Sequence, residues 1–184
     1  PRANYVPNCD SEEYLNRTPK VSWGDQKPVT DYYRLVYRRM IGSSAERTLI
    51  PTIFPKGVSH INTILSLTAK YQKILTNFQG LCSSICYDFF IKVTGRSDLY
   101  ASVLAEMPYF EINDISIRSL ILTCITSHYS DIWEECWDNS FIYDRWSKND
   151  KRLPADHFIN LTPKWNRNVA LRTDYARRQA LVEI

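Results

Sequence analysis

The chain has 184 residues, of which 44% are hydrophobic and 13% aromatic, and this composition excludes disordered, collagen-like and fibrous proteins. Its formal net charge of +3 permits a nucleic-acid partner without requiring one. No apolar run approaches the length of a membrane span, and an odd number of cysteines, five, is more typical of reduced thiols in a cytoplasmic protein than of a disulfide framework. Because the chain begins without Met and ends inside an apolar-periodic segment, we expect both ends to be cuts in a longer protein.

Residues 1–30 are polar and rich in turn-forming residues, which predicts an extended arm or linker. The segments 32–40, 48–54 and 60–67 then show strand-like alternation and are separated by turns that contain Gly or Pro. We therefore expect an antiparallel meander, in which each strand pairs with the next.

The hydrophobic period changes after these strands. Apolar residues recur at helical spacing over 73–93, and Gly95 stands where the C-cap of a helix is expected. Residues 99–112 are predicted to form a strand, and a second long helix is expected over 113–132 with one apolar face.

The last part of the chain, 138–167, contains prolines and many Asn and Asp residues and is predicted to be irregular, with a final helix beginning near Thr173. The fold class is therefore α+β: a small, mostly antiparallel sheet packed with two long helices, an irregular N-terminal arm and a C-terminal helix. We divide the chain into the arm (1–30), an α+β core (31–137) and an irregular segment with the C-terminal helix (138–184).

The sequence lacks the motifs of the catalytic classes that we considered. No two prolines are adjacent, so the Asn/Asp-Pro-Pro-Tyr/Phe motif of an adenine methylase is absent, and no P-loop pattern is present. A metal-dependent nuclease remains a weak alternative, because Asp10 and the run Asp25-Gln26-Lys27 match the residue types of such a site but lie in predicted loops. We predict no catalytic residue in this chain.

Two pairs of potential zinc ligands have helical spacing. Cys82 and Cys86 lie four residues apart on one predicted helix, as do Cys124 and His128 on the other. Because all four belong to apolar stripes, we favour packing in the core over metal binding and predict no metal site.

Basic residues concentrate in two stretches. Residues 34–56 hold five basic residues and one acid, Glu46, and residues 164–178 hold five basic residues and one acid, Asp174. Arg and Lys suit phosphate contacts, and Arg also bonds guanine bidentately. The candidate DNA-binding residues, chosen from these stretches and the neighbouring polar turns, are Arg38, Arg39, Ser43, Ser44, Arg47, Lys56, His60, Asn62, Lys164 and Arg167.

The run YRLVYRRMIGSSAERTLIPTIFPKGVSHINT, residues 33–63, resembles the segment that opens the target-recognition region of large adenine DNA methylases, which include type IIG restriction–methyltransferases and phage-defence methylases. The segments that follow it in the same order are LCSSICYDFFIKVTG (81–95), LAEMPYF (104–110) and LRTDYARRQALVEI (171–184). The resemblance extends over about two-thirds of the chain, as an order of segments.

This resemblance implies a bacterial, site-specific adenine methyltransferase as the parent protein, with or without endonuclease activity. An upstream methylase domain of the same chain would bind S-adenosylmethionine and flip the adenine. The present part would bind double-stranded DNA, read its sequence and need no cofactor of its own. The alternative for Glu46-Arg47-Thr48 is a structural role, in which Arg47 would brace the turn by pairing with a carboxylate.

The alternative function is a protein-interaction or scaffolding domain of the same kind of enzyme. Its anchors would be exposed tryptophans, which are enriched where proteins contact one another. The tryptophans that we consider are Trp133, Trp137, Trp146 and Trp165. A concave basic face would favour the DNA hypothesis, and an exposed apolar patch would favour the protein hypothesis.

Overall fold

The structure is a computed structural model that describes residues 6–42 and 44–184. These residues form seven α-helices and a three-stranded antiparallel sheet, which confirms the predicted α+β class. The strands are β1 (Arg34–Arg38), β2 (Thr52–Phe54) and β3 (Ile64–Leu67). The helices are α1 (Ser11–Arg17), α2 (Gln72–Ser83), α3 (Ile85–Val93), α4 (Ala101–Ala105), α5 (Asn113–Thr123), α6 (Ser130–Cys136) and α7 (Asp174–Val182).

The strand order is β2-β1-β3, so the predicted meander is wrong. β1 pairs antiparallel with both neighbours, with Arg34 opposite Phe54 and Arg38 opposite Ile64. The first four residues of β1 are buried, whereas β3 is only half-buried throughout. The most buried strand therefore takes the central position, and the loop from β2 to β3 runs from one end of β1 to the other.

The helix predicted over 73–93 is broken into α2 and α3 at Ser84. Ser84 is extended, with φ −70° and ψ 154°, and its hydroxyl accepts the N–H of Tyr87 at 3.3 Å. The serine therefore caps a new helix, which competes with helix continuation. Gly95 ends α3 with φ +63°, as predicted, because its N–H donates to the carbonyl of Lys92 in a left-handed turn.

The strand predicted over 99–112 is wrong, because this segment contains the short helix α4. The buried residues of the segment are spaced as on a helix: Leu99, Val103, Leu104 and Met107. The helix predicted over 113–132 is interrupted after α5, where Cys124 leaves helical geometry at ψ 52°. A 3₁₀ turn, Ser127–Tyr129, then leads into α6.

The ends of the chain agree in part with expectation. The N-terminal arm contains α1, which begins after Asp10, whose carboxylate accepts the N–H of Glu13 at 2.8 Å. The segment between α6 and α7 is irregular, as predicted, apart from the 3₁₀ turns Asn139–Tyr143 and Arg167–Val169. α7 begins after Thr173, whose hydroxyl accepts the N–H of Ala176, and this confirms the last helix.

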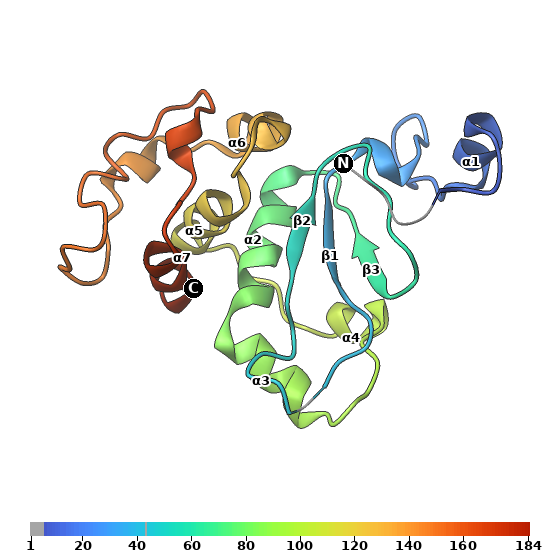
Figure 1. Cartoon of the computed structure of the whole chain (residues 1–184), viewed down its shortest axis with the longest axis horizontal. Coiled ribbons are helices and arrows are strands. Elements are labelled where there is room, and N and C mark those ends of the chain that lie inside the picture. The colour runs from blue at the N-terminus through green and yellow to red at the C-terminus, as the bar shows by residue number, and fades with distance from the viewer. Residues whose placement is uncertain (1–5, 43) are drawn as a thin grey trace.

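α2 is the centre of the fold, with the sheet on one side and α5 on the other (Figure 1). Gly80 of α2 lies against Ile115 and Ser119 of α5, where an added Cβ would clash with the Ile115 side chain. Ser119 also donates to the carbonyl of Thr76 at 2.8 Å. The helices therefore approach closely because Gly80 has no side chain and Ser119 has a small one.

The irregular segment that follows α6 lies on the side of α5 and α7 that is away from the sheet (Figure 1). We call residues 138–172 the C-terminal lobe. It is joined to α5 by the N–H of Leu171, which donates to the carbonyl of Ile121 at 3.2 Å. In the described part of the chain, no helix has the length and apolar character that crossing a membrane requires.

Candidate nucleic-acid interface

Three of the predicted DNA-binding residues meet at one end of the sheet, where β1 ends. Arg38 is exposed and lies opposite the first residue of β3, and the N–H of Arg39 donates to the carbonyl of Thr63 at 3.0 Å. Asn62 precedes Thr63 in the chain, so it lies at the same end of the sheet, and it is exposed. The Nε atom of Arg39 lies 3.3 Å from a carboxylate oxygen of Asp98, so Arg38 has more freedom to contact a ligand than Arg39.

The polar turn that follows β1 is described only in part. Ser43 lies outside the described residues, and Ser44 is exposed. Lys92 of α3 donates to the carbonyl of Ala45 at 2.9 Å, which ties this turn to the end of α3.

Arg47 braces its turn, in agreement with the alternative role that the sequence suggests. Its Nε atom lies 3.5 Å from the carboxylate of Asp88, and its Nη2 atom donates to the carbonyl of Ser84 at 3.2 Å. The same carboxylate accepts the N–H groups of Thr48 and Leu49 at 2.7 and 2.6 Å. Asp88 therefore pins the whole turn onto α3, and the guanidinium of Arg47 is occupied by contacts within the fold.

Lys56 and His60 lie on the crossing loop between β2 and β3, away from the end of the sheet that carries Arg38. The ammonium of Lys56 lies 2.8 Å from Asp131, and the hydrogen bond and charge of Lys56 lower the pKa of that carboxyl. The Nε2 atom of His60 is 2.8 Å from the hydroxyl of Ser66. The turns between the strands therefore do not form the single basic surface that a meander would produce.

Lys164 and Arg167 are exposed in the C-terminal lobe, and the structure places Arg167 in a groove of about 1130 Å³. We call this the basic groove. It has four basic lining residues, Lys151, Arg152, Arg167 and Arg172. Its amide-bearing lining residues are Asn160, Asn166 and Asn168, and Asp156 is its single carboxylate among the described residues.

Sequence reasoning missed most of this basic surface. All seven Lys and Arg residues of the lobe are exposed: Arg145, Lys148, Lys151, Arg152, Lys164, Arg167 and Arg172. The signal in the sequence was the group of four basic residues between 145 and 152, which lies outside the basic stretch 164–178. Arg152 is held by Asp150, at 2.7 Å, and its guanidinium lies 3.8 Å from the centre of the Tyr175 ring.

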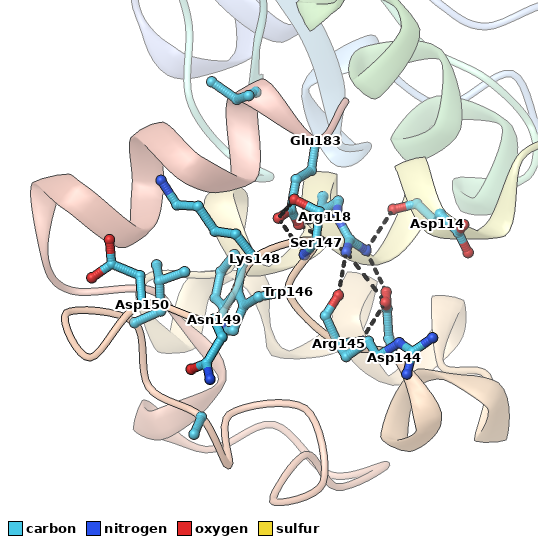
Figure 2. Close-up of a pocket in the computed structure, with 13 residues that line it drawn as sticks. Asp114, Arg118, Asp144, Arg145, Trp146, Ser147, Lys148, Asn149, Asp150 and Glu183 are labelled. Atoms are coloured by element: carbon cyan, nitrogen blue, oxygen red, sulfur yellow. Dashed lines mark hydrogen bonds and ion pairs between the residues drawn. The ribbon is translucent and has the colours of Figure 1, made fainter.

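A second cavity, of about 870 Å³, contains a buried ion cluster around Arg118 (Figure 2). The guanidinium donates to the carboxylates of Asp144 and Glu183, the latter at 3.0 Å from Nε. It also donates to the carbonyl of Arg145 at 3.0 Å and to that of Asp114 at 3.3 Å. Every guanidinium nitrogen is therefore used within the protein, so Arg118 connects α5, the lobe and the end of α7 rather than offering a charge to a ligand.

Glu183 is held ionised in the same cluster. Burial alone would raise its pKa, but hydrogen bonds from Gln179, Ser147 and Arg118 outweigh burial and lower it. The Ser147 hydroxyl donates at 2.7 Å and the Gln179 amide at 2.8 Å. A carboxylate with this many donors is poorly suited to act as a general base.

The tryptophans do not form the exposed anchor surface that the protein-interaction hypothesis required. Trp133 is fully buried, and the other three are half-buried against the core. Their indole N–H groups donate within the chain, from Trp133 to Thr162, from Trp137 to Asn139, from Trp146 to Pro154 and from Trp165 to Cys124.

The exposed apolar surface lies instead on α3, which we call the α3 face. Its exposed side chains are Ile85 (70%), Phe89 (64%), Val93 (61%) and Phe90 (44%). The signal in the sequence was that seven of the nine residues of this helix, ICYDFFIKV, are apolar or aromatic, which exceeds what one buried face requires.

The four residues considered as potential zinc ligands separate into two environments. Cys82 and Cys124 are buried in the core, as predicted, and burial raises the pKa of the Cys82 thiol to about 12. Cys86 and His128 are exposed, so the prediction of core packing is wrong for these two residues. The helix break after α5 removes His128 from the face that carries Cys124.

The residues considered for a nuclease site have ordinary roles. Asp10 is the N-cap of α1, and Asp25 and Lys27 are exposed around a turn in which Gln26 has φ 51°.

Comparison of this chain with protein-family models, curated proteins and solved structures finds no significant match.

Proposed function

We propose that this chain is a DNA target-recognition module of an adenine-specific DNA methyltransferase, and that it binds duplex DNA for a methylase domain elsewhere in the parent protein. The main support is the C-terminal lobe, which exposes seven basic residues, and four of them line the basic groove. The ordered resemblance of residues 33–63 and the following segments supplies the enzyme class. S-adenosylmethionine is then a ligand of the parent protein and not of this part.

The basic groove suits a phosphate backbone. Its four cationic residues are accompanied by three Asn side chains and one carboxylate. Lys and Arg neutralise phosphates and release condensed counterions, and amide groups bond either phosphate oxygens or base edges. Arg38 and Asn62, at the end of the sheet, are a second place where exposed donors are free to contact DNA.

The test measures binding of a fluorescent duplex by anisotropy at several salt concentrations. The triple variant Lys151→Glu, Arg167→Glu, Arg172→Glu should weaken binding and reduce the slope of log K against log salt by roughly one for each phosphate that the variant no longer neutralises. A control that carries the same change in charge outside the groove is Lys20→Glu, Lys27→Glu, Lys70→Glu. Equal weakening in both variants, or no salt-dependent binding by the unmodified chain, would refute the proposal.

The second candidate function is a protein-interaction domain of the same enzyme, and the α3 face favours it. An apolar helix face in contact with water is typical of a surface that another domain covers. Phe89→Ser with Val93→Ser should then lower methylation by the parent protein while leaving duplex binding by this chain unchanged. Matched Ser substitutions at exposed Tyr71 and Tyr100, outside the lobe, test whether loss of any exposed apolar side chain has the same effect.

A further inference from the structure

Arg34, the first residue of the central strand, is a buried cation without a counter-ion. Only 3% of the residue is exposed. Its Nη2 atom donates to the carbonyl of Val58, and its Nε atom is buried without a partner. In the described part of the chain no carboxylate lies within 4.0 Å of this guanidinium, and residues 1–5 and 43 contain no Asp or Glu.

This arrangement is energetically unfavourable for the chain alone. A buried charge that lacks a partner is destabilising, and burial accordingly lowers the pKa of Arg34. The comparison with Arg118 is informative, because that buried guanidinium is paired with two carboxylates. An anion from outside the described fold would provide the compensation that Arg34 lacks.

Arg34 lines a cavity of about 540 Å³ between the N-terminal arm and the sheet. None of its described lining residues is an Asp or Glu, and the lining includes a second cation, Arg17. Arg17 is mostly exposed and pairs with Glu13 of the same helix, so it is a weaker source of charge than Arg34.

The remaining polar lining consists of groups that donate hydrogen bonds to oxygen. The hydroxyl of Ser66 is 2.8 Å from His60, and the hydroxyl of Tyr14 is hydrogen-bonded to that of Ser59. A guanidinium with a planar set of donors, surrounded by hydroxyl and imidazole groups, matches the charge and the oxygen acceptors of a phosphate group.

We propose that this cavity is a phosphate-binding site in which Arg34 supplies the buried charge, and His60, Ser59 and Ser66 contact the oxygens of the anion. The phosphate group comes either from the backbone of a bound nucleic acid or from a free phosphate in solution. The site is separate from the basic groove, because the arm and the C-terminal lobe lie on opposite sides of the molecule (Figure 1).

Isothermal titration of the 184-residue chain with inorganic phosphate, in a phosphate-free buffer, tests the site directly. We expect saturable binding, competition by sulfate, and a Tm that rises with phosphate concentration, because a ligand that binds only the folded state stabilises it. Sodium chloride at equal ionic strength should reproduce neither effect. Arg34→Met should abolish phosphate binding and the rise in Tm, and the exposed-arginine control Arg96→Met should retain both.

A second variant keeps the test decisive if Arg34→Met fails to fold. His60→Gln with Ser66→Ala leaves the buried cation in place and should weaken phosphate binding several-fold. The source is identified by the shifts of the His60 ring signals in NMR spectra. If a DNA duplex reproduces the shift that inorganic phosphate induces, the phosphate comes from a nucleic-acid backbone. If inorganic phosphate induces the shift and the duplex does not, the ligand is the free anion. Absence of saturable phosphate and sulfate binding, or unchanged affinity in Arg34→Met, would overturn the proposal.

Discussion

Replacement of Arg118 by Met should destabilise the protein more than replacement of any exposed arginine. Only 6% of the Arg118 side chain is exposed, and it neutralises Asp144 and Glu183, whose side chains are 16% and 5% exposed. Met fills a similar volume but leaves two nearby carboxylates without their cation (Figure 2).

The magnitude follows from removing one partner of a buried ion pair, which costs about 3–5 kcal/mol. Domains of this size are stable by about 5–15 kcal/mol, so the loss is a large fraction of the total. Each kcal/mol lowers Tm by about 2–4 °C in a protein of 150–250 residues, and we therefore expect a decrease of about 6–20 °C.

The measurement is urea unfolding, followed by circular dichroism, with Arg17→Met as the matched control. Arg17 also forms an ion pair, with Glu13, but its side chain is 74% exposed, so its replacement should cost less than about 1 kcal/mol. The double variant Arg118→Met, Glu183→Met should lose less stability than the sum of the two single variants, because the second change removes one orphaned carboxylate. A destabilisation below about 1 kcal/mol in Arg118→Met would contradict this account of the cluster.

The remaining predictions concern the turn, the helix contact and acid stability. Asp88→Ala should cost about 2–3 kcal/mol in urea unfolding, because the N–H groups at 48–49 lose their acceptor. Gly80→Ala should cost about 1–3 kcal/mol by the same assay, and Ile115→Ala should be less harmful in that background than in the unmodified chain, since it removes the clashing side chain. Burial lowers the pKa of His157 from 6.5 to about 4, so the unfolded state binds a proton before the folded state does, and stability is lost as the pH falls from about 6.5 to 4. The variant His157→Gln should therefore show a smaller difference in unfolding free energy between pH 7 and pH 5. NMR titration of His157 measures its pKa directly.

Local patterns predicted the elements whose boundaries are set by neighbouring residues. The end of α3 at Gly95 and the start of α7 after Thr173 depend on a left-handed turn and on a side-chain cap, both of which are encoded locally. The break at Ser84 was missed although serine is a good cap, because apolar spacing continues on both sides of it. Strand order depends on which strand is most deeply buried, and that is a property of the assembled fold.

The candidate site was less predictable, because a cation in a sequence does not indicate its partner. Arg38 is exposed, Arg39 lies beside Asp98 and Arg47 lies beside Asp88. Asp88 lies 41 residues from Arg47 along the chain, so only the fold shows that this arginine is occupied. Lys56 is paired at long range in the same way, with Asp131.

The C-terminal lobe shows how a segment without helices or strands of useful length can still present charges in fixed positions. Its backbone carbonyls at Thr162 and Pro154 accept indole N–H groups from Trp133 and Trp146, at 2.9 and 3.1 Å. The tryptophans are therefore structural in this part of the chain, and their burial holds the backbone on which the lysines and arginines are exposed. Because the backbone of the lobe is already fixed, binding of a phosphate in the groove costs mainly the conformational entropy of the lysine and arginine side chains. A flexible basic tail would lose backbone entropy as well, so the same contact costs less entropy here.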